Sequence, residues 1–390
     1  MNKRCIIRLV LGLAAVFAIY GTPASAAAHY ALATSPSKLY LLSSDGGSVS
    51  SRVLYDFGSS YTHRDVAVIG KKILVTEKNN DGSQLLVLNL TSSQGTYSAN
   101  IGNIIALNNG ESKVTQVGSI AIDKSGGIYI TDSYTFDAKY AYLPNLSSAV
   151  QISSLGNDNY PQVDAAAVGN GVVITHENAD SYLNGASYAT YLAGGGLGGT
   201  PAELLKAQNP IAVAGNDMGY AYVVSEGFDG NFDPSYITMY GTSSGVIISP
   251  QVLPGIIGGI TSFVLNDINY LAIVGTDNGT AKLWKTTVDN SGATSGWTSA
   301  SGGVDSTRNQ QCAASLDGTA VWFTQPGVGH VGLVNTDTWA MSGGLDINDQ
   351  ISSIIGFDAP GSVVPEPSSL AALASFAAAG LAMLRRRHTL

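Results

Sequence analysis

The sequence is poor in cysteine. It contains two cysteines in 390 residues, Cys5 and Cys312. Cys5 lies in an N-terminal segment with the features of a removable leader, so the mature chain keeps only Cys312 and forms no disulfide within itself. Cys312 stands in an apolar stretch, which favours a buried, inert thiol over a nucleophile. The sequence therefore excludes a fold that depends on internal disulfides.

Positive charge is also scarce. The chain has 19 Lys and Arg against 28 Asp and Glu. Six of the basic residues lie close to the two ends of the chain, namely Lys3, Arg4, Arg8, Arg385, Arg386 and Arg387. Outside these six, 13 basic residues stand against 28 acidic ones, a net charge of about −15. Such a field disfavours nucleic acid and anionic lipid headgroups as partners, and favours cations or basic surfaces.

Known catalytic motifs are absent as well. The sequence holds no H-E-x-x-H, no G-x-S-x-G and no cluster of Cys and His. Charged residues make up only 12% of the chain, so the surface is polar mainly through hydroxyl and amide groups. We therefore expect a protein that is not an enzyme and holds no cofactor, with Ca²⁺ as the one exception considered below.

The N-terminus predicts a secretory signal peptide over residues 1–26. Lys3, Arg4 and Arg8 form a basic region, residues 9–19 form an apolar region, and Ala24-Ser25-Ala26 is a typical cleavage site. The mature protein is therefore expected to be exported across the inner membrane.

The C-terminus has three parts, which are Val364-Pro365-Glu366-Pro367, an apolar run over residues 370–384, and Arg385-Arg386-Arg387. As a helix, the run of about 15 residues reaches roughly 22 Å, less than the roughly 30 Å of a hydrocarbon core. The arginines stay on the cytoplasmic side, which leaves the Pro-Glu-Pro segment just outside the membrane. We expect transient membrane attachment; an ordinary C-terminal membrane helix is the alternative.

This tail closely resembles the PEP-CTERM sorting signal of Gram-negative bacteria. The resemblance rests on residues 364–369, the Ala- and Leu-rich run and the arginine cluster. It implies that the chain is an exosortase substrate, with a sorting transpeptidase or protease as partner, and that it is destined for the cell envelope or the extracellular matrix. It implies nothing about the activity of the body. We therefore divide the chain into the signal peptide 1–26, the body 27–362 and the sorting segment 363–390.

The body contains a repeat of short β-rich segments. Each copy reads as a strand, a tight turn rich in Gly, Asn or Asp, and a second strand that ends at Thr or Ser. Successive copies lie about 46 to 53 residues apart. The copies cover residues 65–76, 119–131, 165–175, 211–225, 262–276 and 313–324.

A period near 50 with several short strands per unit predicts an all-β, seven-bladed β-propeller, flanked by an N-terminal signal helix and a C-terminal apolar helix. Tyr30–Thr34, Lys38–Ser43 and Ser51–Phe57 look like the second, third and fourth strands of a blade that lacks its first. Ser352–Asp358 looks like a first strand without the rest. Pairing these segments closes the ring in a seventh blade and removes an open sheet edge. Two β-sandwich domains are the alternative.

One copy, residues 119–133, is similar to the NHL and SMP-30/gluconolactonase class of propeller repeats, and the other copies match more loosely. Those families include metal-dependent lactonases and lyases, so the resemblance implies a metal-assisted enzyme as an alternative function. No set of residues here can be placed on their metal site, and the likeness supports the fold rather than the chemistry.

Three sets of polar residues are candidate ligand sites. The first set follows the second strand of five copies and is expected to form an acidic rim on one face; it comprises Glu77, Asp132, Glu177, Glu226 and Asp277. The second set leads the first strands and is expected at the mouth of the channel; it comprises Gln116, Gln162, Gln208, Gln310 and Gln350. The third is Asp229, Asn231 and Asp233, whose spacing suits Ca²⁺ ligands. The alternatives are turn solvation for the acids and hydrogen bonds to the adjoining blade for the glutamines.

Taken together, the sequence predicts an exported, envelope-associated propeller that serves as a binding or scaffold module of the extracellular matrix. Polysaccharide or envelope proteins are the expected partners, and nucleic acid is not. A lactonase- or lyase-type enzyme and a Ca²⁺-dependent adhesin are the alternatives.

Overall fold

A computed structural model describes residues 29–357, apart from a set of short gaps. The gaps are residues 46–47, 59–61, 80–81, 94–95, 110–111, 134–138, 156–161, 178–186, 196, 200, 205–207, 227–234, 246, 302–311, 315–317 and 326–328. The expected signal helix, the C-terminal apolar helix and the whole sorting motif lie outside the described residues and stay predictions. Across the part that is described, we find no helix long and apolar enough to span a membrane.

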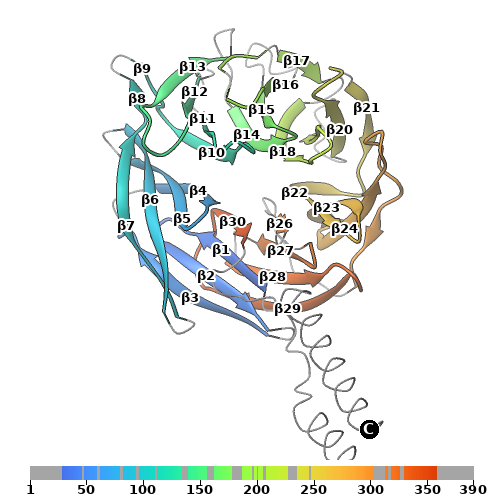
Figure 1. Ribbon diagram of the computed structural model, residues 1–390. Helices are drawn as coiled ribbons and strands as arrows, with labels where there is room; N and C mark the ends of the chain where they lie inside the picture. Colours follow the sequence, from blue (N-terminus) through green and yellow to red (C-terminus); the bar gives the residue numbers. More distant parts are fainter. Residues whose placement is uncertain are drawn as a thin grey trace, which may run out of the picture. The chain divides into compact units, whose positions relative to one another are not determined.

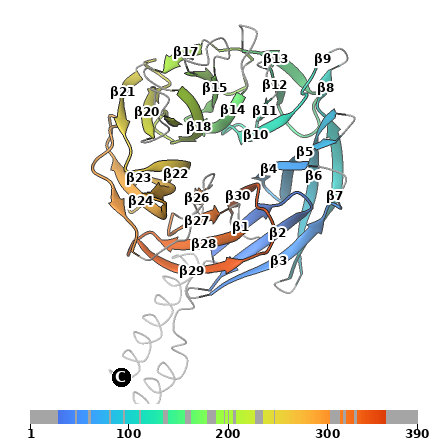
Figure 2. The same ribbon diagram turned by 180° about the vertical axis from the view of Figure 1, so that it is seen from behind.

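The described residues form seven four-stranded antiparallel sheets arranged around a central axis (Figures 1 and 2). Blade 1 consists, from the axis outward, of β30 (Ser353–Gly356), β1 (His29–Thr34), β2 (Lys38–Ser44) and β3 (Val49–Asp56). Blade 2 consists of β4 (Thr62–Ile69), β5 (Lys72–Asn79), β6 (Gly82–Ser93) and β7 (Thr96–Ala106), and is followed by the small hairpin of β8 (Asn108–Asn109) and β9 (Ser112–Lys113). This architecture confirms the predicted propeller.

The remaining blades follow in chain order. Blade 3 contains β10 (Val117–Ile122), β11 (Ile128–Asp132), β12 (Lys139–Leu143) and β13 (Gln151–Ser154), and blade 4 contains β14 (Gln162–Val168), β15 (Gly171–Glu177), β16 (Ser187–Leu192) and β17 (Pro201–Leu204). Blade 5 contains β18 (Gln208–Gly215), β19 (Tyr220–Glu226), β20 (Tyr236–Gly241) and β21 (Ile247–Val252). Blade 6 contains β22 (Ile256–Leu265), β23 (Ile268–Asp277), β24 (Thr280–Val288) and β25 (Thr298–Ser299), and blade 7 contains β26 (Cys312–Ala314), β27 (Ala320–Gln325), β28 (His330–Asn335) and β29 (Ala340–Asp346).

Blade 1 closes the ring with strands from both ends of the described chain, as the sequence predicts. β30 pairs antiparallel with β1, with Thr34 opposite Ser353 and Ala31 opposite Gly356. Beyond the strands, the amide of Phe357 donates to the carbonyl of Tyr30 over 3.1 Å. The innermost strand thus comes from the end of the described residues and the other three from their beginning, so blade 1 has four strands like the other blades.

The two faces of the ring differ in how the chain crosses them. In blades 2 to 6 the first strand begins at one face, which we call the entry face, and leads by a short turn at the opposite face, which we call the turn face, into the second strand. Gly, Asn and Asp residues with positive φ allow these turns to be tight: Gly169 has a φ of 57°, and Asn266 and Asp267 in blade 6 have φ of 51° and 61°. The turn face therefore carries compact hairpin tips close to the axis.

The core lies between neighbouring blades. Each apolar cluster draws its side chains from two blades, as where Tyr222 of blade 5 packs with Leu271 and Trp284 of blade 6. Trp322 and Tyr129 are among the largest side chains that are completely buried. Burying one such side chain stabilises the fold by about 1.5 to 3 kcal/mol. The ring is thus held by contacts between blades and provides a fixed frame for the hub.

Candidate functional site

A hollow of about 330 Å³ opens on the turn face beside the axis. The tips of blades 3, 4 and 5 and the inner hairpin of blade 6 form its walls. Its lining is Ile122, Asp123, Lys124, Ala167, Gly169, Gly215, Asn216, Asp217, Ser262, Phe263, Val264 and Asn269. We call the polar side chains at its opening, Lys124, Asp217, Ser262 and Asn269, the hub mouth.

Two turns of the same design shape this hollow. In blade 3 the carboxylate of Asp123 accepts hydrogen bonds from the backbone amides of Ser125 and Gly127, each over 2.8 Å. In blade 5 the side-chain oxygen of Asn216 accepts the amide of Tyr220 over 3.0 Å. Burial by itself raises the pKa of Asp123, but hydrogen bonds from Ser125 and these amides outweigh burial and hold the pKa below its ordinary value. Asp123 is thus fully engaged as a turn residue.

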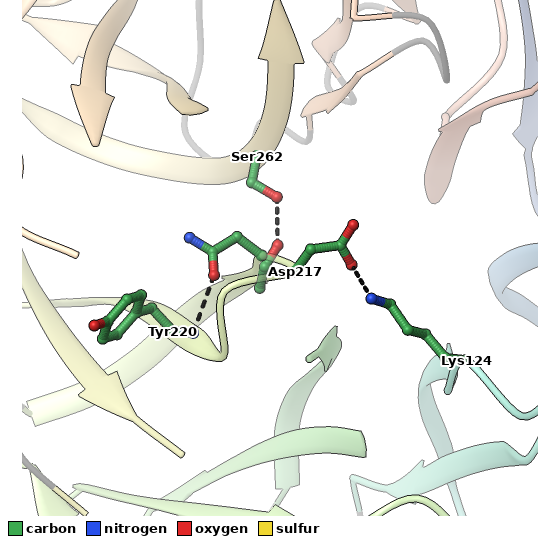
Figure 3. A network of polar contacts seen from close by, with 6 residues as sticks. Lys124, Asp217, Tyr220 and Ser262 are labelled. Atoms are coloured by element: carbon green, nitrogen blue, oxygen red, sulfur yellow. Dashed lines mark hydrogen bonds and ion pairs between the residues drawn. The ribbon is translucent and has the colours of Figure 1, made fainter. Parts of the chain in front are cut away.

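The residues that follow these two positions form an ion pair across blade 4. Lys124 Nζ lies 2.9 Å from a carboxylate oxygen of Asp217, and the two side chains point toward one another in Figure 3. Between them blade 4 has the short turn at Gly169, whose amide donates to the carbonyl of Asn216 over 2.9 Å. The side chains of Lys124 and Asp217 are 52% and 77% exposed. Because an exposed pair is worth at most about 1 kcal/mol, a ligand can replace it at little cost.

The opposite wall of the hollow comes from blade 6. The hydroxyl of Ser262 donates to the carbonyl of Gly215 in blade 5, a contact that Figure 3 shows next to the ion pair. Asn269 places its side-chain amide 3.7 Å from the sulfur of Met218. Gly215 permits the blades to approach, because a Cβ there would lie 2.0 Å from the carbonyl oxygen of Ala167. The opening thus presents one cation, one carboxylate, one amide and one hydroxyl on a floor of backbone.

A second set of polar groups lies on the first strands of blades 1 to 4. Asp65 on β4 accepts hydrogen bonds from Ser119 Oγ (3.0 Å) and the amide of Ile120 (2.8 Å) in blade 3, and also from Ser353 Oγ in blade 1. One carboxylate thereby joins three blades. Burial raises the pKa of Asp65, although its hydrogen-bond donors act in the opposite direction.

Asp164 on β14 occupies the corresponding place in blade 4. It accepts the amide of Val213 in blade 5 over 2.9 Å and interacts with Ser119 of blade 3. Burial raises its pKa to about 6, and the negative charge of Asp65 adds to the rise. We call Ser353, Asp65, Ser119 and Asp164 the hub belt, because side chains from four neighbouring blades form a connected chain of hydrogen bonds and polar interactions.

The five acids expected at a rim all lie in the second strands, near or at the entry face. Asp132, Glu177, Glu226 and Asp277 end β11, β15, β19 and β23, and Glu77 lies within β5. The sequence predicted that these acids follow the second strands in loops, but they belong to the strands themselves. The reason is that the hydrogen-bonded pairing with the first strand extends as far as these residues; Glu226, for example, pairs with Gln208.

Three of these acids bond to residues close to them in the fold. Asp132 accepts the backbone amides of Thr115 and Gln116 over 2.7 and 2.9 Å, and Glu77 accepts the side-chain amide of Gln84. Asp277 forms an ion pair of 2.5 Å with Lys282. These acids thus bond within their own blades, and the role of a ligand rim stays a prediction.

Four of the five glutamines lie where first strands begin, on the entry face. Gln162 and Gln208 are the first residues of β14 and β18, and Gln116 directly precedes β10. Gln350 comes three residues before β30 and is exposed. Gln310 lies outside the described residues, as does the Ca²⁺ candidate formed by Asp229, Asn231 and Asp233. Their roles remain predictions.

No group of three or more His, Cys, Asp or Glu side chains within residues 29–357, gaps excluded, is arranged to hold a metal ion.

No protein-family model matches the chain, and no curated protein matches it. Solved structures do resemble it. A functionally unknown protein from Desulfotomaculum acetoxidans DSM 771 aligns with 84% of this chain and 98% of its own at 13% identity, with a TM-score of 0.61. A protein from Lactobacillus plantarum aligns over 85% and 100% of the two chains at 10% identity, with a TM-score of 0.57.

A putative 6-phosphogluconolactonase from Bacteroides fragilis NCTC 9343 is also similar. It covers 86% of this chain and 99% of its own at 11% identity, with a TM-score of 0.52. At such identities the likenesses show the propeller fold and carry no information about chemistry.

Neither the hub mouth nor the hub belt was found by sequence reasoning, although both leave a signal. Lys124 and Asp217 each follow the Asp or Asn that opens a turn, so an alignment of the turns places opposite charges at equivalent positions two blades apart. Asp65 and Asp164 each precede a turn glycine by five positions, Gly70 and Gly169 respectively. A comparison of copies for shared polar positions, in addition to shared apolar ones, would have shown both pairs.

Proposed function

We propose that the protein is an exported, envelope-associated propeller that binds a polar ligand at the hub mouth and acts as a binding or scaffold module of the extracellular matrix. The observation that carries the proposal is the hollow of about 330 Å³ on the turn face, with Lys124, Asp217, Ser262 and Asn269 at its opening. Concave sites with a few converging polar groups are the usual binding places of such folds.

The chemistry of the hub mouth favours an uncharged or zwitterionic polar ligand, such as a short stretch of polysaccharide or an extended peptide. Its single cation and single exposed carboxylate cancel one another, so the opening does not select strongly for net charge. Hydroxyl, amide and backbone groups then provide the recognition. Export and destination are supported by the signal peptide and by the PEP-CTERM resemblance of the tail.

A binding screen with neutral, acidic and amino polysaccharide fragments tests this proposal. We expect a binder whose affinity falls about tenfold in Lys124→Ala and in Asn269→Ala, since each loses one hydrogen bond of about 1 to 1.5 kcal/mol. Lys282→Ala is the matched control, because Lys282 forms its ion pair with Asp277 on the entry face. Equal losses in all three variants, or no binder in the screen, would count against the hub mouth.

The same screen separates the two alternatives. A metal-assisted lactonase or lyase predicts turnover of a lactone or sugar that stops when a chelator is added. A Ca²⁺-dependent adhesin predicts that chelation lowers the melting temperature of the protein. An unchanged melting temperature and an unchanged substrate leave the binding function in place.

A further inference from the structure

The outermost strand of each blade has one edge that pairs with no further strand of its sheet, and most of these outer edges are protected. β13 and β17 have four residues each, and β25 has two. β3 carries Arg52 and Asp56, and β21 carries Pro250. The edge of β29 is covered by Ser301, which exchanges backbone hydrogen bonds with Trp339 and Met341. Shortness, charge, proline and covering are the usual ways in which proteins prevent strands from pairing between molecules.

β7 in blade 2 lacks the first three of these protections. It is 11 residues long, with the sequence TYSANIGNIIA, and contains no charged residue and no proline. Most of it is exposed, and the side chains of Ile101 and Ile104 are each 50% exposed. Gly102 is an extra residue that interrupts the pairing of β7 with β6. On either side of it the pairing is regular, and Thr96–Ile101 lies opposite Leu88–Ser93 without a break.

The neighbouring blade holds β7 in this extended form. Near its beginning, the buried ring of Tyr97 packs edge-on against Tyr30 of blade 1 at 5.9 Å, and Tyr30 in turn contacts Phe357 at 6.3 Å. In both ribbon views β7 lies on the outside of the ring next to β3. The strand is therefore fixed before any partner arrives, which lowers the entropy cost of adding a further strand.

We propose that β7 pairs in antiparallel fashion with β7 of a second copy of this chain, which gives a two-fold dimer joined edge to edge. Charge restricts where a second copy can bind. The chain outside its six terminal basic residues has a net charge of about −15, so two copies repel each other over most of their surface. β7 is a long outer edge where a second copy brings no charge at all.

Geometry argues for the same occupant. An antiparallel pair of identical strands is self-complementary and closes after two copies, so it does not extend into a fibre. Each copy covers the exposed Ile101 and Ile104 of the other and offers hydrogen-bond partners to the backbone along the other edge.

Sedimentation equilibrium of the purified protein over a range of concentrations tests the dimer. We expect a monomer–dimer equilibrium whose Kd rises at least about tenfold in the double variant Ile101→Lys and Ile104→Lys, because two positive charges then face two others across the edge. Val252→Lys on the proline-bearing strand β21 is the matched control, since Val252 is 58% exposed and should leave the Kd unchanged.

A second measurement keeps the test independent of the lysine variants. In a Cys312→Ser background, Asn103→Cys should be joined between copies by a short bifunctional maleimide, and Ser50→Cys on β3 should not. A monomer at every concentration, species larger than a dimer, a dimer that the double lysine variant leaves intact, or equal crosslinking at both positions would each overturn the proposal.

Discussion

The hub belt and the hub mouth surround the same axis with similar residue types, yet their polar groups are used in opposite ways. In the belt, Asp65 accepts donors from two other blades, and protein groups take up its oxygens. In the mouth, Lys124 and Asp217 touch mainly each other and are largely exposed. The comparison teaches that a polar residue near the axis stabilises the ring when it is buried among partners from other blades, and is available to a ligand when it is largely exposed to solvent.

The largest expected effect comes from breaking the belt at its centre. Asp65→Ala leaves the hydroxyls of Ser119 and Ser353 and the amide of Ile120 without their acceptor. We expect the free energy of unfolding to fall by about 3 kcal/mol, measured by urea denaturation. Asp217→Ala in the mouth should change it by less than about 0.5 kcal/mol. Equal midpoints for the two variants would remove the distinction between belt and mouth.

A slightly smaller loss of stability is expected from a change at Gly215, which lines the hollow and lies where blades 4 and 5 approach each other. Gly215→Ala places a Cβ 2.0 Å from the carbonyl oxygen of Ala167 and 2.3 Å from Val168, which forces blades 4 and 5 apart. We expect a loss of about 2 to 3 kcal/mol in thermal or urea unfolding. Gly296→Ala is the control, because nothing lies within 4 Å of its added Cβ. Normal stability of the Gly215 variant would show that the blades can separate at this point.

The pH dependence of stability sharpens the comparison further. Burial raises the pKa of Asp164 from 3.8 to about 6, so the folded state binds its proton more tightly and loses stability as pH rises through this range. Burial lowers the pKa of His176 from 6.5 to about 4, so stability is lost as pH falls through that range. The two groups therefore oppose each other between about pH 4 and pH 6.5.

Asp164→Asn should remove only the first of these contributions. We expect the wild type to gain about 2 kcal/mol relative to this variant when the pH is lowered from 7 to 4, measured by urea unfolding at each pH. The same titration on Asp217→Asn serves as the control for the mouth. A difference between wild type and Asp164→Asn that does not change with pH would contradict the raised pKa.

The smallest effect on stability is expected at the mouth itself. Lys124→Ala removes one side of an exposed ion pair and should move the melting temperature by no more than about 2 °C. Any ligand found in the binding screen should nevertheless bind less tightly to this variant. A large drop in melting temperature would show that the Lys124–Asp217 pair stabilises the ring, as the hub belt does.

The sequence predicts the arrangement of strands and blades better than the polar contacts near the axis, because the arrangement of strands depends on local patterns. Copies near a period of 50 and the missing first strand of blade 1 are both visible along the chain, and they led to the correct ring and closure. The bond between Asp65 and Ser353 joins residues 288 positions apart, and it exists only because blades 1 and 2 meet in one register. The Lys124–Asp217 pair likewise depends on the short turn of the blade between them.

The acids of the second strands show a second reason for the difference. Their regular spacing was visible, but spacing does not reveal what a carboxylate bonds to. Asp132 binds the two amides just before its own blade's first strand, which only the folded ladder brings within 2.7 and 2.9 Å.

The closure of blade 1 also determines how the protein responds to mechanical load. The described chain begins at His29 and ends at Phe357, and both positions lie on the turn face at one blade. A pull on the chain beyond Phe357 acts on β30, which has four residues, and the first bond that it loads is the one between the amide of Phe357 and the carbonyl of Tyr30. Tension applied beyond Phe357 would therefore separate β30 from β1 before it unfolds the six blades whose strands follow one another along the chain.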